Sequence, residues 1–241
     1  MVLLFSSLQK TQNLRLKAYY STGVDYYMVK TFICAIPYQK RGETKDKDEL
    51  RDVLYEPRGN TKLAYGSTRF PIIPVINGYA AKGDKIRVIA ILTDGPNYKY
   101  NFDTYFLPDI ARLVDDNGYA FDGVETISSP DSESIDTQLE LFMNIISRIG
   151  DDEELYACIT YGTKPTPIVQ LMAMNYAYKI KKNTSVGCIA YGRYMHADPN
   201  NNNGIYDQTA LFYMDSIVNK LAEMKAPQPE AAIRAMLGIE G

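Results

Sequence analysis

Residues 154–191 have the sequence ELYACITYGTKPTPIVQLMAMNYAYKIKKNTSVGCIAY, in which two short apolar runs flank a longer helical stretch. The runs ELYACITY (154–161) and SVGCIAY (185–191) predict strands. The segment between them, TPIVQLMAMNYAYKIKK (166–182), predicts a helix that begins at prolines and ends at lysines. Strand, helix and strand in this order predict a parallel βαβ unit.

The same alternation of strands and helices extends toward the N-terminus. KTFICAIP (30–37) and KIRVIAIL (85–92) are almost continuously apolar, as expected for strands of a sheet covered on both faces. VETISS (124–129) is a weaker strand, and a helix with apolar residues at helical spacing follows it and ends at Gly150. We therefore expect an α/β, Rossmann-like fold with a mostly parallel sheet of five to six strands and helices on both faces.

Domain boundaries follow from the first and last predicted elements. Met28 stands directly before the first strand, so residues 1–27 are interpreted as an N-terminal extension outside the core. Residues 28–225 form the predicted Rossmann domain, which ends with a helix over 207–224 capped by Asp207 or Thr209, and residues 226–241 form a C-terminal tail with a last helical turn or two.

Two polar stretches interrupt this pattern. Residues 38–60 are highly charged and predict a surface loop with a short amphipathic segment. Residues 200–203 are four consecutive Asn, which predict a flexible loop.

Composition excludes several classes of function. The formal net charge of -3 shows no basic surplus, so binding to duplex nucleic acid is not expected. The three cysteines lie far apart in apolar runs, which favours reduced thiols in a cytoplasmic protein, and metal-ligand spacing is absent. The apolar run near the N-terminus is too short for a signal peptide or a membrane span.

No bound cofactor is expected either. The chain has neither a GxGxxG motif after a strand nor a GxxxxGK[ST] motif, so the dinucleotide and nucleoside-triphosphate interpretations lose their main support.

The stretch CITYGTKPTP (158–167) predicts an anion site at the corner between a strand and a helix. Gly162 permits close approach of the backbone, Thr163 can cap the helix, Lys164 supplies a charge and Pro165 fixes the first helical φ. The alternative is a purely structural corner, in which Thr163 only caps and Lys164 is solvated.

This corner resembles the motif Asp-x-Thr-His-Gly-x-Arg-x-x-Pro of the CRISPR-associated Rossmann-fold (CARF) sensors. Thr160, Gly162 and Pro167 match, whereas Lys164 stands in place of Arg, Tyr161 in place of His, and Cys158 in place of Asp. Downstream, VGCIAYGRYM (186–195) resembles the strand of that family that ends in Tyr-Tyr-Gly, and GIYDQTALFYMDSIVNKLA (204–222) resembles its following helix. The resemblance covers residues 28–225.

The resemblance implies a homodimer that binds cyclic oligoadenylate, tetra- or hexa-adenylate, the second messenger of type III CRISPR antiviral defence. Two corners, one from each subunit, would meet the ring around a two-fold axis. The implied ligand-binding residues are Pro37, Tyr38, Gln39 and Lys40 after the first strand, Thr160, Tyr161, Gly162, Thr163 and Lys164 at the corner, and Tyr191, Gly192 and Arg193 after the fifth strand.

The resemblance also raises the possibility of catalysis at the corner. Some CARF proteins cleave their own ligand as ring nucleases, and here Lys164, Thr160 and Thr163 are the candidates to stabilise charge during metal-independent attack by a ligand 2'-hydroxyl. No general base is visible, so binding alone and binding with slow cleavage both remain open. His196, the only histidine, follows Arg193 by three residues and lies just past the fifth strand, so an attached nuclease is not expected.

Two further functions remain as alternatives. One is a non-catalytic interaction module that passes the messenger signal to a separate effector. The other is an unrelated nucleotide-metabolising α/β enzyme, although no reactive constellation for it is found in the sequence.

Overall fold

The computed structural model describes residues 28–38, 50–194 and 203–237. The predicted extension 1–27 and the candidate residues Gln39, Lys40 and His196 lie outside the described residues. The chain divides into two units, one of which is Met28–Phe212 and the other of which includes residues 213–237. The larger unit carries the candidate site.

The described residues form an eight-stranded sheet in the order β3-β2-β8-β7-β6-β1-β4-β5. Its centre is a parallel set in which β1 pairs with β4 and β6, β4 pairs with β5, and β6 pairs with β7. The bounds are β1 Val29–Ala35, β4 Lys85–Thr93, β5 Ala120–Ser129, β6 Glu153–Cys158 and β7 Ser185–Arg193. The predicted α/β, Rossmann-like fold is confirmed, with more strands than the five to six expected.

The additional strands extend the β7 side of the sheet. β8 (Gly204–Asp207) is antiparallel to β7, β2 (Val53–Arg58) is parallel to β8, and β3 (Gly66–Thr68) is antiparallel to β2. The prediction of a loop and an amphipathic segment over residues 38–60 is therefore wrong for residues 53–58, where Tyr55 is fully buried. Pairing with β8 and β3 stabilises this strand, and neither partner could be recognised from a local pattern.

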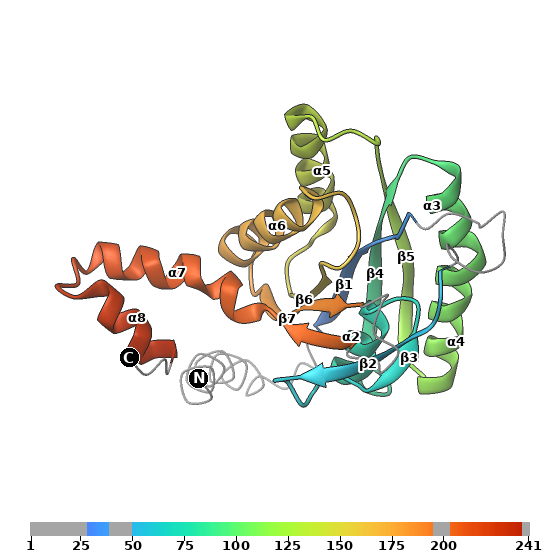
Figure 1. Ribbon diagram of the computed structural model, residues 1–241, viewed down its shortest axis with the longest axis horizontal. Helices are drawn as coiled ribbons and strands as arrows, with labels where there is room; N and C mark the ends of the chain where they lie inside the picture. Colours follow the sequence, from blue (N-terminus) through green and yellow to red (C-terminus); the bar gives the residue numbers. More distant parts are fainter. Residues whose placement is uncertain (1–27, 39–49, 195–202, 238–241) are drawn as a thin grey trace. The chain divides into compact units, whose positions relative to one another are not determined.

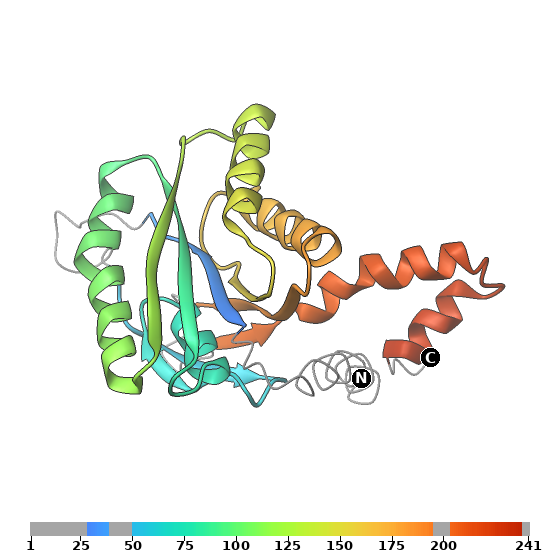
Figure 2. The ribbon, with the colours of Figure 1, turned by 180° about the vertical axis from the view of Figure 1, so that it is seen from behind.

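Helices cover both faces of the central sheet, as expected. Figure 1 shows α5 (Ile135–Arg148) and α6 (Thr166–Ile180) together on one side and α4 (Leu107–Asn117) on the other. α2 (Ile72–Tyr79) contacts β1, β6 and β7, and α3 (Pro96–Asn101) continues through the π-helical turn η1 (Phe102–Phe106) into α4. Figure 2 shows β5, β4 and β1 side by side between the two helical layers.

The main core lies between the sheet and the layer that contains α2, η1 and α4. Phe32 of β1 stacks on Tyr156 of β6 with ring centroids 4.7 Å apart, and Phe70 packs edge-on against Phe106. Ile33, between Phe32 and Cys34, is fully buried and points to the opposite face, which α5 and α6 cover. Burial on both faces explains why the strand sequences show almost no polar alternation.

The prediction that Gly150 caps the C-terminus of α5 is wrong. α5 ends at Arg148, and Gly150 does not adopt a positive φ. Its N–H donates instead to the Glu153 carboxylate at 2.8 Å, and a Cβ at Gly150 would lie 3.0 Å from Glu153 Oε1. A side chain at position 150 would crowd this carboxylate, which favours glycine here.

The C-terminal elements follow the predicted pattern. α7 (Thr209–Glu223) begins where the Asp207 carboxylate accepts the N–H of Thr209 at 2.8 Å, and Asp207 also accepts the Thr209 hydroxyl. α8 (Pro229–Leu237) occupies the predicted helical turns of the tail.

Candidate functional site

The order of the parallel strands defines a topological switch point. Within the central parallel set, β4 and β5 lie on one side of β1, and the later strands β6 and β7 lie on its other side. At such a point the loops after the two central strands diverge and leave a crevice at the carboxyl edge of the sheet, where open α/β folds bind ligands. The switch point lies between β1 and β6, so its loops are Ile36–Tyr38 and the predicted corner at 159–165.

Gly162 makes the sharp turn of the corner. Its φ is +106°, and a Cβ at this position would lie 2.8 Å from the Thr166 Cβ. Both the conformation and the close contact favour glycine. The turn carries the chain from the end of β6 directly into α6.

The start of α6 differs from the predicted capped helix. Pro165 occupies the N-cap and no side chain caps the helix, because the Thr163 hydroxyl pairs with the Thr166 hydroxyl at 3.0 Å. Pro165 and Pro167 have no N–H, and the Thr166 N–H donates to the Thr163 carbonyl at 3.0 Å. An anion at this corner would therefore depend mainly on Lys164 and on the amides of the turn.

Thr160 and Tyr161 hold the corner to neighbouring elements. The Thr160 hydroxyl accepts the Gly192 N–H at 2.7 Å and lies 3.1 Å from the Cys158 sulfur. The Tyr161 hydroxyl donates to the Arg69 carbonyl at 2.9 Å, and burial raises the pKa of Tyr161 above its usual value of about 10. Tyr161 is therefore a neutral hydrogen-bonded anchor rather than a titrating group near pH 7.

Close packing also constrains the end of β7. A Cβ at Gly192 would lie 2.6 Å from the ring of Pro71 and 3.0 Å from the ring of Tyr55. Gly192 thus has a structural reason to be glycine, in addition to the ligand contact that the resemblance implies.

The exposed candidates are Lys164, Tyr191 and Tyr38. Among the described residues nothing forms an ion pair or hydrogen bond with the Lys164 side chain, and it is exposed. Tyr191 is 42% exposed and Tyr38 is 48% exposed, with the Tyr38 ring 5.2 Å from that of Tyr98. These three side chains are available to a ligand above the sheet edge.

Pro37 and Arg193 complete the candidates that the structure describes. Pro37 is buried, and its carbonyl accepts a hydrogen bond of 2.9 Å from the buried Asn101 amide, which fixes the loop after β1. Arg193 is half-buried at the last position of β7. The carboxyl edge therefore brings together candidates from β1, β6 and β7.

Neither buried thiol near the corner has the character of a nucleophile. Cys34 and Cys158 are register partners on β1 and β6, and both are free and buried. Burial raises the pKa of Cys158 to about 11 and that of Cys34 in the same direction. Both thiols therefore stay protonated near neutral pH, which disfavours nucleophilic chemistry. Within the described part of the chain, no cluster of three or more His, Cys, Asp or Glu residues could hold a metal ion.

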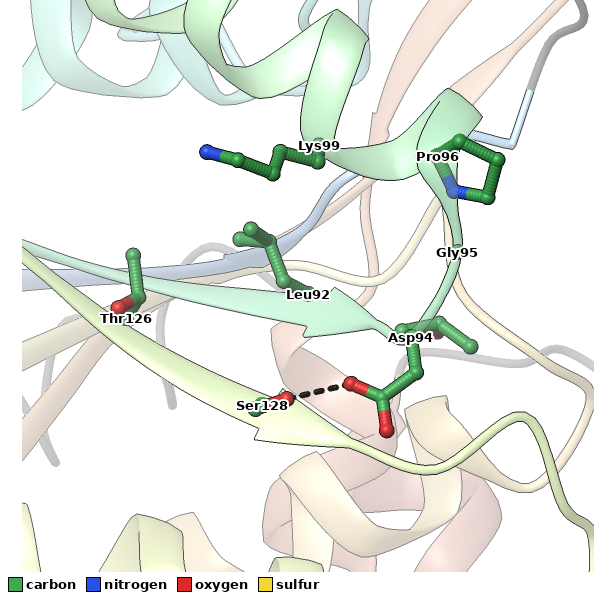
Figure 3. A pocket seen from close by; sticks show the side chains of 8 residues that line it. Leu92, Asp94, Gly95, Pro96, Lys99, Thr126 and Ser128 are labelled. Carbon is green, nitrogen blue, oxygen red and sulfur yellow. Dashed lines mark hydrogen bonds between the residues drawn. The ribbon is translucent and has the colours of Figure 1, made fainter.

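A hollow that the sequence prediction missed lies beside this edge, between the ends of β4 and β5 and the start of α3 (Figure 3). It has a volume of about 390 Å³, and its polar lining includes Asp94, Thr126 and Ser128. The signal in the sequence is Thr-Asp-Gly-Pro directly after an apolar strand (93–96), which resembles the composition of the 158–167 corner. This signal is only four residues long and therefore does not stand out in the sequence.

Comparison with known proteins adds no identification. No protein-family model matches the sequence, and no curated protein matches it. None of the helices in the described ranges has the length and apolar character needed to cross a membrane.

Proposed function

We propose that this chain is a sensor of cyclic oligoadenylate in type III CRISPR antiviral defence. The observation that supports the proposal is the position of the CARF-like stretch 158–167, which follows β6 at the switch point between β1 and β6. A cytoplasmic location is part of the proposal, and the three free buried thiols support it because thiols stay reduced there.

The chemistry of the exposed candidates suits a ring of nucleotides. Lys164 is an exposed cation without a competing partner among the described residues, so it can pair with a phosphodiester. Tyr38 and Tyr191 are exposed aromatic rings at the ends of β1 and β7, on which adenines could stack. A small anionic ligand with planar bases is therefore a better fit than a duplex.

A second copy of the chain is the proposed partner. Exposed apolar side chains recur on α5 and α6 at spacings of four residues: Ile135, Leu139, Met143, Ile168 and Met172. α5 and α6 pack against each other, and Ile168 lies in the first turn of α6, next to the corner. Self-association through this face would bring two corners close together, as a two-fold symmetric ring requires.

Cleavage of the ring has less support than binding, because two of its three candidate catalytic residues are hydrogen-bonded within the protein. The hydroxyl of Thr160 already bonds the Gly192 N–H, and that of Thr163 pairs with Thr166, so both are held by the protein rather than aimed at an empty site. Lys164 remains the group best able to stabilise developing charge on a phosphate. Binding with slow cleavage, or with none, is the expected behaviour.

The proposal is tested by calorimetric titration of the purified chain with cyclic tri-, tetra- and hexa-adenylate. Each mixture is then incubated without added metal and its products are separated by chromatography. Tight binding of one ring, at one ring per dimer, would support the sensor, and linear products would add a ring nuclease. If no ring binds, the proposed sensor is wrong, and the interaction module with its apolar face on α5 and α6 becomes the better candidate.

A further inference from the structure

The hollow between β4, β5 and α3 is lined by the Asp94 carboxylate, of which only one oxygen accepts a hydrogen bond from the protein. The Ser128 hydroxyl donates to Asp94 Oδ1 at 2.5 Å, and Figure 3 shows the other carboxylate oxygen turned away from Ser128. Within residues 28–38, 50–194 and 203–237, no other hydrogen bond or ion pair to the Asp94 carboxylate is found, while the Asp94 backbone N–H donates to the Ser129 carbonyl at 2.8 Å. Asp94 is exposed, so its second oxygen is free to accept a hydrogen bond from a ligand.

The lining of the hollow selects for hydroxyl groups rather than anions. Asp94 repels phosphate, and the one lysine at the hollow, Lys99, is already paired with Asp103 at 2.7 Å. The Thr126 hydroxyl can accept as well as donate, and the Ser128 hydroxyl, whose proton is donated to Asp94, can still accept. A sugar hydroxyl fits this set because it donates to the carboxylate and accepts from a neighbouring hydroxyl.

The hollow and the proposed phosphate site lie at the same edge of the sheet. β1 is the single strand between β6, which leads to Lys164, and β4, which leads to Asp94. Two strand spacings correspond to roughly 10 Å. Asp94 and Lys164 thus follow the carboxyl ends of strands on either side of β1, at the same edge of the sheet.

We propose that Asp94, held by Ser128, binds a ribose 2'-hydroxyl of the ligand and so selects ribonucleotides over deoxyribonucleotides. This inference rests on the proposed function, because a 3'–5'-linked ring leaves the 2'-hydroxyl as its only free sugar hydroxyl. An analogue that lacks this hydroxyl loses one hydrogen bond to a charged group, which weakens its binding by about tenfold or more.

The test compares cyclic tetra- and hexa-adenylate with their fully 2'-deoxy counterparts by calorimetry, on the intact chain and on Asp94→Asn. Asp116→Asn, an exposed carboxylate in the last turn of α4, is the matched control. We expect the deoxy ring to bind the unaltered chain at least tenfold more weakly, and Asp94→Asn to bind both rings with similar, reduced affinity. Equal affinities for the two rings in the unaltered chain would overturn the subsite while leaving the sensor intact.

A second measurement keeps the subsite testable if no ring binds. Adenosine and 2'-deoxyadenosine are titrated at millimolar concentration while the Gly95 backbone amide, next to Asp94, is followed by NMR. A shift with adenosine alone, lost in Asp94→Asn, would support the hydroxyl site although the sensor proposal had failed. The same response to both nucleosides, or to neither, would overturn the subsite.

Discussion

The Thr160 hydroxyl accepts the backbone N–H of Gly192 at 2.7 Å and so joins the carboxyl ends of β6 and β7. Gly192 is buried, so its N–H has no access to water if this partner is removed. Thr160→Val keeps the shape of the side chain and removes the acceptor. We expect it to lower the free energy of unfolding by about 1–3 kcal/mol, measured by urea denaturation.

Thr160→Ser is the matched control, because it keeps the acceptor and loses only a methyl group. It should retain most of the stability that Thr160→Val loses. If both variants unfold at the same urea concentration as the unaltered chain, the hydrogen bond does not contribute to holding the edge together.

Gly162 provides a second test of the corner, on conformation rather than hydrogen bonding. Gly162→Ala introduces a Cβ at φ +106° and within 2.8 Å of Thr166. Gly123 has a φ of +96° with nothing within 4 Å of an added Cβ, so Gly123→Ala isolates the conformational cost. We expect Gly162→Ala to be more destabilising than Gly123→Ala by about 1–3 kcal/mol, since overpacking adds to the backbone strain.

Thermal and urea unfolding of the two alanine variants measure that difference. Equal losses of stability would mean that α6 shifts to accommodate the new methyl group, and that the corner is less rigid than its geometry indicates.

β1, β4, β6 and β7 could be predicted from the sequence because each is an apolar run that is largely buried, whereas the edge strand β5 is mostly exposed and gave a weaker signal. β2 and β8 could not, since VLYEPR and GIYD are short and partly polar and become strands only by pairing with each other and with β7. Gly150 shows the same limit, because its role depends on Glu153, which also accepts the Thr31 hydroxyl at 2.7 Å.

The candidate site was predictable to a similar extent. The corner at 158–167 stands out because glycine, lysine and prolines follow a buried strand, and the structure has that strand–turn–helix order. Asp94 does not stand out in the sequence, because its proposed role depends on β5 bringing Ser128 beside it, a contact between residues distant in sequence. Similarly, only the fold reveals that Thr160 and Gly192 are partners.

Lys164→Ala tests the proposed phosphate contact. Lys164 is exposed and lacks a partner among the described residues, so its removal should leave the free energy of unfolding unchanged within experimental error. Ring affinity should fall by about 1.5–3 kcal/mol through loss of a charge-assisted contact, as measured by calorimetry. Lys182→Ala, an exposed lysine beyond the other end of α6, is the control for net charge and should bind normally.

If Lys164→Ala binds the ring with unchanged affinity, the corner is not part of the ligand site. Equal weakening in both lysine variants would instead indicate that only the overall charge of the chain affects binding.

The exposed apolar face on α5 and α6 predicts that two copies of the chain form a dimer through this face. Ile168 is 61% exposed and lies in the first turn of α6, so Ile168→Glu should leave the fold intact and introduce an unpaired charge into the proposed dimer interface. We expect sedimentation equilibrium to show a shift from dimer to monomer, with a parallel loss of ring binding. Val218→Glu, at a 49% exposed position of α7, is the control and should remain dimeric. A dimer that persists in Ile168→Glu would exclude this face.

The buried thiols predict how stability depends on pH. Burial raises the pKa of Cys158 to about 11, and burial together with Asp207 raises that of Cys188 to about 12. In the unfolded chain a thiol ionises near about pH 8.5. The folded state therefore retains protons that the unfolded state has lost, so this contribution to stability is complete below about pH 8.5 and declines as the pH rises toward the folded pKa values.

We expect the free energy of unfolding, measured in urea with a reductant present, to fall between pH 9 and pH 11. Each thiol should contribute a slope of up to about 1.4 kcal/mol per pH unit in that window. Cys158→Ala removes one such group, so its stability at pH 7 should be lower because of the cavity, whereas its slope above pH 9 should be shallower. Parallel pH profiles for the variant and the unaltered chain would show that Cys158 is more accessible to water than its burial at the end of β6 implies.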